Sequence, residues 1–354
     1  MAAPLLRQTF PLGTQWPTID PFLFVAHHLD DYPAANGQLG PDAALDDRDL
    51  GQDFAGVDGW NMYHGQTVPG FPQHPHRGFE TVTYVRTGRI DHADSLGATA
   101  RFGDGDTQWM TAGAGVQHCE MFPLLRTDAP NPLELFQIWL NLPASDKMVD
   151  PYFTMLWRHD TPTRQVTSDG STVEVTVIVG ELLGENPATP PPNSWASRPD
   201  AEVAIWHLSF EPGASIELPP TRGPETERVL YAFEGSSLTL ASADDRAELE
   251  AGNGALVASD TAVTLTAGAG GLEVLILQGK PIAEPVARYG PFVMNTDEEI
   301  RQAFADYRST EFGGWPWSSP EPNHGPDKDR FAIHADGRLE PPDPLPSGEL
   351  SRQN

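Results

Sequence analysis

The sequence predicts an all-β protein made of two copies of one domain. Short apolar runs rich in β-branched residues recur between turn signals, and 33 glycines and 35 prolines leave few stretches with helical periodicity. Such spacing is typical of a β-sandwich or β-barrel. The clearest strand candidates are residues 81–85, 135–140, 173–179, 203–208, 229–233 and 272–277.

An internal repeat supports the two-domain interpretation. Residues 80–88 read E-x-V-x-Y-x-x-x-G, and residues 227–235 read the same, at an offset of 147 residues. The same offset carries Gly105 onto Gly252. Self-similarity at a fixed offset indicates repeated structural units. We therefore expect one β-barrel domain at residues 1–150 and a second at residues 151–290.

Three further segments depart from the repeat. Residues 30–70 hold eight aspartates and several glycines and are interpreted as a solvated acidic insertion, since the spacing of an EF-hand loop is absent. Residues 291–317 contain a predicted helix, with a capping box from Thr296 to Glu299 and an apolar stripe at Ile300, Ala303, Phe304 and Tyr307. Residues 318–354 are rich in proline and acidic residues, and we expect an irregular tail.

The charge excludes several classes of partner. Lysine and arginine number 22 against 50 acidic residues, which gives a net charge of -28. Nucleic acid and anionic membranes both need a basic surface, so neither is expected as a direct partner. With one cysteine, Cys119, no disulfide can form within the chain, which fits a cytoplasmic protein. We find neither a signal-peptide pattern nor an apolar run of membrane-spanning length.

Two short segments contain the residues that we expect to bind a metal ion. They are His74-Pro75-His76 and His118-Cys119-Glu120, separated by 41 residues that are interpreted as several strands. Side chains two residues apart in a strand point to the same face. The two candidate metal ligands of each segment should therefore lie side by side on one face of their strand. Three imidazoles and a carboxylate suit a divalent transition metal. We therefore predict a metal site where the two segments meet.

The spacing leaves the identity of the carboxylate open. Glu80, four residues after His76, competes with Glu120, because many cupin barrels use a His-x-His-x-x-x-Glu motif in which that glutamate binds the metal. Cys119 should face away from its two neighbours and is interpreted as a small buried residue. The offset of 147 places Thr221, Gly223, Leu265 and Ala267 at the ligand positions of the second copy, so only the first copy should hold a metal.

Several separated motifs together resemble the pirin family. They are residues 20–23, 70–88, 108–121, 141–143 with 147–148, and 290–296. The similarity spans roughly residues 15–310. It implies a bicupin fold, with two tandem antiparallel β-barrels of the jelly-roll type, a short C-terminal helix and iron in the N-terminal barrel. The family's metal ligands fall on His74, His76, His118 and Glu120, so by this resemblance Glu80 is not a ligand.

The resemblance also implies two functions of different classes. Some pirins act like quercetinases, which open the central ring of a flavonol with O2 and release carbon monoxide. Here Glu120 would serve both as ligand and as catalytic base, and Fe(II) would be the metal, with Mn, Co, Ni, Cu or Zn as substitutes. Other pirins are iron-dependent regulators that sense redox state and bind a protein partner. We favour the metal-dependent oxygenase acting on a small aromatic substrate such as a flavonol.

Overall fold

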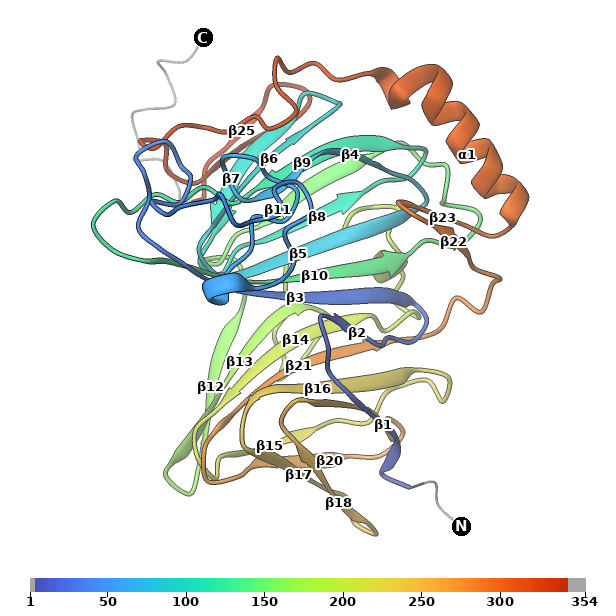
Figure 1. Cartoon of the computed structure of the whole chain (residues 1–354). Helices are drawn as coiled ribbons and strands as arrows, with labels where there is room; N and C mark the ends of the chain where they lie inside the picture. Colours follow the sequence, from blue (N-terminus) through green and yellow to red (C-terminus); the bar gives the residue numbers. More distant parts are fainter. Residues whose placement is uncertain (1–3, 343–354) are drawn as a thin grey trace, which may run out of the picture. The chain divides into compact units, whose positions relative to one another are not determined.

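A computed structural model describes residues 4–342 of the chain, which divide into two compact units (Figure 1). One unit comprises residues 27–137, 147–159 and 285–354 and is called the histidine barrel below, because it carries both His-containing motifs. The other comprises residues 1–26, 138–146 and 160–284 and is called the second barrel. Within each unit, two antiparallel sheets enclose one apolar core. The all-β prediction is confirmed.

The histidine barrel is built around two six-stranded sheets, with strand orders β11-β8-β5-β10-β3-β2 and β25-β24-β7-β6-β9-β4. Two strands, β3 and β10, contribute residues to both units. The strands of these sheets are β2 (Gln15–Trp16), β3 (Phe22–Tyr32), β4 (Gly70–His76), β5 (Phe79–Thr87), β6 (Arg89–Asp94), β7 (Thr99–Gly103), β8 (Thr107–Thr111), β9 (Val116–Met121), β10 (Asn131–Asn141), β11 (Tyr152–Leu156), β24 (Phe331–Ile333) and β25 (Leu339–Glu340). Of these, β2 belongs to the second barrel. A two-stranded sheet is formed by β22 (Ala287–Tyr289) and β23 (Phe292–Met294).

The second barrel contains a seven-stranded sheet of order β1-β19-β16-β21-β14-β13-β12 and a four-stranded sheet of order β15-β20-β17-β18. The strands are β1 (Leu6–Pro11), β12 (Thr163–Ser168), β13 (Ser171–Val179), β14 (Ala204–Phe210), β15 (Ser215–Leu218), β16 (Glu227–Gly235), β17 (Ser237–Ala241), β18 (Arg246–Glu250), β19 (Asn253–Val257), β20 (Val263–Ala267) and β21 (Leu272–Gly279). Three short 3-10 turns are η1 (Val57–Gly59), η2 (Trp195–Ser197) and η3 (Glu311–Gly313).

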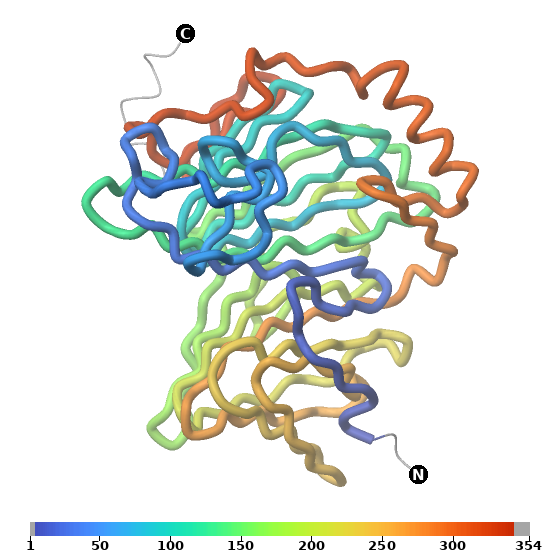
Figure 2. Tube along the Cα trace, in the orientation of Figure 1, coloured from blue at the N-terminus to red at the C-terminus, as the bar shows by residue number. Residues whose placement is uncertain are grey.

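The units are discontinuous in sequence, unlike the contiguous domains expected at 1–150 and 151–290. The reason lies in the pairing of the first strand: β1 pairs antiparallel with β19, from Leu6 opposite Val257 to Pro11 opposite Asn253. The trace in Figure 2 follows this N-terminal segment along the strands near residue 250. The N-terminal strand therefore completes the second barrel rather than the first.

The strand registers bear out the internal repeat. In the histidine barrel Thr81 lies opposite Met110 and Thr83 opposite Gln108. In the second barrel Arg228 lies opposite Val257 and Leu230 opposite Ala255, at the same offset of 147 for every residue. The two β-hairpin frameworks are thus equivalent position by position.

The predicted helix forms as α1 (Asp297–Thr310), with the capping box in place. The Glu299 amide donates to Thr296 Oγ1 over 3.2 Å, and the Thr296 amide donates to Glu299 Oε2 over 2.8 Å. The apolar stripe packs on β23, where Phe292 and Met294 join Ile300 and Ala303 in one cluster. Among the described residues, no helix is long and apolar enough to cross a membrane.

The acidic insertion is less solvated than expected. Asp30 is fully buried and accepts hydrogen bonds from the Asn61 amide (2.8 Å) and the Tyr63 hydroxyl (2.7 Å). Asp53, also buried, pairs with Arg48 over 2.8 Å. These carboxylates fold the insertion back on itself, because a buried charge must find donors.

The segment that follows α1 is also more ordered than the irregular tail expected. Strand β24 pairs with β7, and buried Arg330 binds Asp106 over 2.7 Å. Fully buried Arg101 binds both oxygens of Asp91 (2.6 and 2.7 Å) and donates to the Gly325 carbonyl. The part of the predicted tail at residues 343–354 lies outside the described residues.

The pair of Arg101 and Asp91 should make a large contribution to the stability of the histidine barrel. Replacing Arg101 with Ala leaves Asp91 as a buried carboxylate without its partner, which typically costs about 3–5 kcal/mol. We expect a loss of that order in urea denaturation. In contrast, Arg301→Ala, at the exposed pair with Glu298, should keep the wild-type midpoint. Equal midpoints for all three proteins would contradict this assignment.

Candidate metal centre

The two predicted motifs lie side by side on paired strands. Strands β4 and β9 run antiparallel, with His74 directly opposite His118 and His76 opposite Val116. Directly opposite side chains share a face, so the histidines of both motifs point into the barrel together. Pro75, which has no N–H, is tolerated because β4 is the edge strand of its sheet.

A bulge in β4 sets this register. From Phe71 to His74 the chain advances three residues, while its partner strand moves only two, from Glu120 to His118. One extra residue in a strand reverses which face the following side chains occupy. The bulge therefore turns His74 and His76, rather than Gln73 and Pro75, toward His118.

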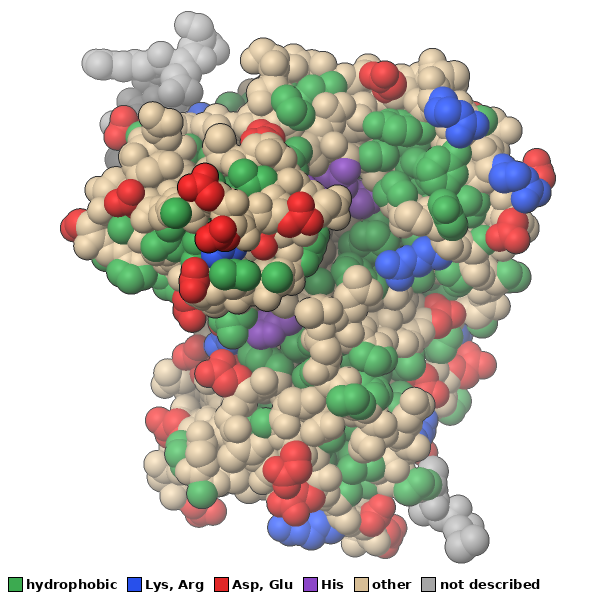
Figure 3. Space-filling view, in the orientation of Figure 1, with side chains coloured by type: hydrophobic (Ala, Val, Ile, Leu, Met, Phe, Trp, Pro, Cys, Tyr) green, Lys and Arg blue, Asp and Glu red, His purple; other side chains and the backbone are tan. Residues whose placement is uncertain are grey.

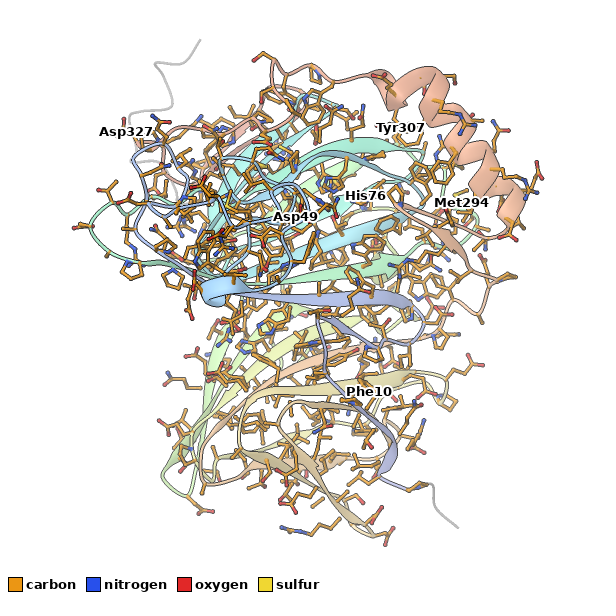
Figure 4. All side chains as sticks on the ribbon, in the orientation of Figure 1. Phe10, Asp49, His76, Met294, Tyr307 and Asp327 are labelled. Carbon is orange, nitrogen blue, oxygen red and sulfur yellow. The ribbon has the colours of Figure 1, made fainter. Side chains whose placement is uncertain are left out.

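The three imidazoles converge at one point. One ring nitrogen from each of His74, His76 and His118 lies within 4.8 Å of the others. The ring centroids are 4.4 Å apart for His74 and His118, 4.9 Å for His76 and His118, and 4.8 Å for His74 and His76. Figure 4 labels His76 among the side chains of this barrel. This is the three-histidine group that the sequence predicts.

The hydrogen bonds of the group fit a metal ion. A backbone carbonyl can only accept, so the 2.8 Å contact from His74 Nδ1 to the Pro72 oxygen places the proton on Nδ1 and leaves a lone pair on Nε2. His76 Nδ1 makes a longer contact of the same kind, 3.4 Å, with the Pro291 oxygen. Such outer partners are typical of metal-bound histidines.

His118 gives the strongest sign that a ligand belongs there. Its side chain is fully buried, and neither ring nitrogen has a hydrogen-bond partner among the described residues. Buried polar atoms in folded proteins nearly always have partners. A metal ion bound by His118 would provide a partner for one of these two nitrogens.

Burial also keeps these rings uncharged. Burial lowers the pKa of His74 to about 4, and burial together with the neighbouring histidines holds the pKa of both His76 and His118 well below the ordinary value. All three rings are therefore neutral at pH 7. Neutral imidazole is the form that binds metal.

Glu120 lies beside the histidines, held by two polar side chains. Its Oε2 is 3.9 Å from His118 Nε2 and accepts a hydrogen bond from Gln137 Nε2 over 2.9 Å. Its Oε1 is 3.0 Å from Thr83 Oγ1, which also lies 2.5 Å from Gln137 Oε1. Burial raises the pKa of Glu120 above its ordinary value, although Thr83 and Gln137 oppose this.

Glu80 occupies the other face of its strand. Thr83 contacts Glu120, and side chains three apart along β5 point to opposite faces, so Glu80 faces away from that contact. Glu80 Oε1 instead accepts a hydrogen bond from Thr111 over 2.7 Å. Cys119 likewise faces away, as expected, and packs with Ala93 and Met121 in a separate apolar cluster.

Sequence reasoning missed three residues around the group: His92, Thr83 and Gln137. The His92 ring is fully buried, 5.6 Å from the His118 ring, and lies opposite Glu120 on the paired strand β6. The spacing of His92 and Asp94, a histidine and a carboxylate two residues apart, was a signal that could have found it. No comparable signal marked Thr83 or Gln137.

Residues from the C-terminal part of this unit are bonded to positions next to the ligands. Arg77, adjacent to His76, binds Asp306 of α1 over 2.7 Å. Gln117, adjacent to His118, donates to the Glu311 carbonyl over 2.6 Å and accepts from the Tyr307 hydroxyl over 3.0 Å. In Figure 4, Tyr307 and Met294 are labelled in the same part of the molecule as His76. The helix and its neighbours thereby fix the edge of the candidate site.

Comparison with known proteins identifies relatives along most of the chain. The family described as pirin matches residues 6–140, and the pirin C-terminal cupin domain matches residues 205–313. A Pseudomonas aeruginosa protein with a provisional quercetin 2,3-dioxygenase name is 40% identical over 242 residues, which cover 68% of this chain and 79% of the relative. Human pirin is 34% identical over 258 residues, covering 72% and 81% respectively.

A solved structure supports the fold. The crystal structure of quercetin 2,3-dioxygenase from Acinetobacter baumannii matches with a TM-score of 0.67 at 24% identity. The match covers 88% of this chain and 99% of that one. It confirms the bicupin fold.

Histidine burial predicts a specific pH dependence of stability. His28 packs among Tyr63, Phe71 and Phe122, and burial, with help from His27, lowers its pKa to about 4. Below pH 6.5 the unfolded chain takes up a proton on this residue while the folded chain does not. Folding stability should therefore fall between pH 6.5 and pH 4, by up to about 3 kcal/mol for this one residue.

Urea denaturation of metal-free wild type and His28→Gln at several pH values isolates the effect, because other titrating groups cancel in the difference. The stability of the variant relative to wild type should rise as the pH falls from 6.5 to 4. A difference that does not change with pH would contradict a neutral, half-buried His28.

Proposed function

The chain belongs to the pirin family, and on that basis we propose that it is a metal-dependent dioxygenase of the quercetinase type, acting on a flavonol with O2. The observation that carries the proposal is the convergence of three neutral imidazoles beside a buried, oriented carboxylate. The name of the 40% identical relative supports the choice of reaction.

In this proposal His74, His76, His118 and Glu120 hold the metal. The donor set of three imidazole nitrogens and one carboxylate oxygen suits Fe(II), and the absence of a thiolate among the candidate donors separates it from soft-metal sites. A divalent metal held there would act as a Lewis acid toward an oxygen of the substrate.

Glu120 is the proposed base. In the absence of a metal, burial raises the pKa of Glu120 above its ordinary value. When Glu120 takes the proton of a flavonol hydroxyl, its Oε1–H can donate to Thr83 Oγ1, 3.0 Å away. Thr83 can accept because its own hydroxyl proton is directed to Gln137 Oε1 at 2.5 Å. The hydrogen bonds of Thr83 and Gln137 thus stabilise the protonated carboxyl group of Glu120.

The neighbouring surface is compatible with access for a small molecule. Figure 3 shows histidine surface beside a hollow, at the place where Figure 4 labels His76 in the same orientation. His76 itself is 4% exposed, so a substrate would bind beside histidines that are almost inaccessible to water. Exclusion of water strengthens electrostatic interactions in such a site.

The direct test is turnover of quercetin. Full-length protein is reconstituted anaerobically with Fe(II), mixed with quercetin and O2, and followed by loss of the flavonol absorbance. We expect turnover by wild type and a loss of about 100-fold or more in kcat for Glu120→Gln, since the amide cannot accept the proton.

Glu80→Gln is the matched control, because it removes the same charge from the opposite face of β5 and keeps an oxygen for Thr111. It should retain activity within a few-fold of wild type, with metal content measured in parallel for every variant. No turnover with any of Fe, Mn, Co, Ni or Cu would sink the proposal for this substrate, and would favour the metal-responsive regulator instead.

A further inference from the structure

The second barrel has lost every metal ligand at the equivalent positions. Ile216 lies opposite Leu265 and Leu218 opposite Val263, as His74 lies opposite His118 and His76 opposite Val116. The strand register therefore equates the histidines of β4 with Ile216 and Leu218, at an offset of 142, rather than with Thr221 and Gly223. With Leu265 and Ala267 on β20, all four positions are apolar and buried.

A cavity of about 590 Å³ nevertheless lies at the corresponding end of this barrel, where β15 ends and β16 begins. This volume is in the range of small-molecule sites. Its walls combine polar residues with an apolar part formed by Trp206 and several prolines, among them Pro187, Pro190, Pro219 and Pro220. Two charged side chains in these walls are largely buried, Arg228 and Glu202.

Arg228 occupies the position of Thr81 in the histidine barrel, by the register that equates β16 with β5. It is 1% exposed. Its Nε and Nη2 donate to Gln278 Oε1 over 2.8 and 2.6 Å, and Nη2 also donates to the Pro219 carbonyl over 2.9 Å. These partners, which also line the cavity, fix one edge of the guanidinium group.

The third nitrogen, Nη1, has no hydrogen-bond partner among the described residues, although it is buried. Burial lowers the pKa of Arg228 to about 10, while the charge of Glu202 opposes this, so the group remains charged at neutral pH. A buried cation with two free N–H groups is costly unless an anion or another acceptor meets it.

The nearest acidic residue in the wall does not fill this role. Both oxygens of Glu202 are already bonded: Oε1 accepts from the Arg222 amide over 2.8 Å, and Oε2 accepts from the Gly223 amide (2.8 Å) and the Thr226 hydroxyl (2.7 Å). Although burial raises the pKa of Glu202, these hydrogen bonds lower it overall, so it stays ionised. Its negative charge disfavours a dianion such as a phosphate monoester more strongly than a monoanion.

We propose that this cavity of the second barrel binds a small organic monocarboxylate, whose carboxylate meets Arg228 Nη1 and whose apolar or aromatic body packs against Trp206 and the proline walls. The Nη1 group of a guanidinium can donate a charge-assisted hydrogen bond to a carboxylate oxygen. The metal-free barrel thus keeps a ligand site in which a fixed side-chain cation replaces a metal ion. The proposal is independent of the oxygenase activity of the other barrel.

The test compares carboxylates with their uncharged amides on the full-length, metal-loaded protein. The probes are 4-fluorobenzoate and 4-fluorobenzamide, followed by fluorine NMR, and 1-naphthoate and 1-naphthamide, followed by calorimetry. We expect saturable binding of the carboxylates and roughly 10- to 100-fold weaker binding of the amides, because a charged hydrogen bond is lost. This comparison needs no variant and does not depend on the folding of a mutant.

Location is tested with 4-iodobenzoate in crystals, where anomalous scattering from iodine marks its position. Iodine should lie in the cavity in wild type and be lost from it in Arg228→Gln. Arg246→Gln, which removes an exposed charge from β18 of the same barrel, is the matched control and should bind like wild type.

Equal affinity for carboxylate and amide would overturn the proposal. So would the absence of saturable binding by both carboxylates up to ~10 mM, or iodine found only at the histidines of the other barrel. Because binding rather than turnover is measured, failure here leaves the oxygenase proposal unaffected, and failure of quercetin turnover leaves this one unaffected.

Discussion

The candidate metal centre depends on one backbone feature, the bulge between Phe71 and His74 that sets the register of β4 against β9. Because side chains alternate along a strand, one residue more or less would turn both histidines of β4 out of the barrel. The close approach of the two strands also needs Gly70, where φ is 131°. A Cβ atom at this position would lie 2.4 Å from the backbone carbonyl oxygen of Glu120. A short segment of β4 thus decides whether three imidazoles meet.

Burial then determines the protonation state of these imidazoles. In the absence of a metal, the same desolvation that keeps the histidines neutral raises the pKa of Glu120. The contacts of Arg77 with Asp306 and of Gln117 with Glu311 hold the C-terminal helix beside the ligands. Burial and the contacts of neighbouring residues therefore act together on the three histidines and Glu120.

Strand alternation made much of the site predictable, whereas long-range contacts did not. His74, His76 and His118 were found because two residues at i and i+2 must share a face. The choice between Glu80 and Glu120 needed either family resemblance or the structure, since spacing says nothing about which face of β5 looks inward. The constant offset of 147 gave the right partners for β9 but missed the five-residue drift in β4, because loop lengths differ between the copies. Burial of Asp30 and Asp53 could not be foreseen, as their donors come from residues distant in sequence.

In our proposals, the same framework would bind ligands in two ways, through a metal held by imidazoles in one barrel and through the guanidinium of Arg228 in the other. The central claim concerns the first of these, and X-ray absorption at the metal edge of reconstituted full-length protein tests it most directly. The account predicts a shell of light atoms with the scattering of three imidazoles, and loss of one oxygen scatterer in Glu120→Ala but not in Glu80→Ala. A sulfur neighbour, which would place Cys119 on the metal, or fewer than three imidazoles would contradict it.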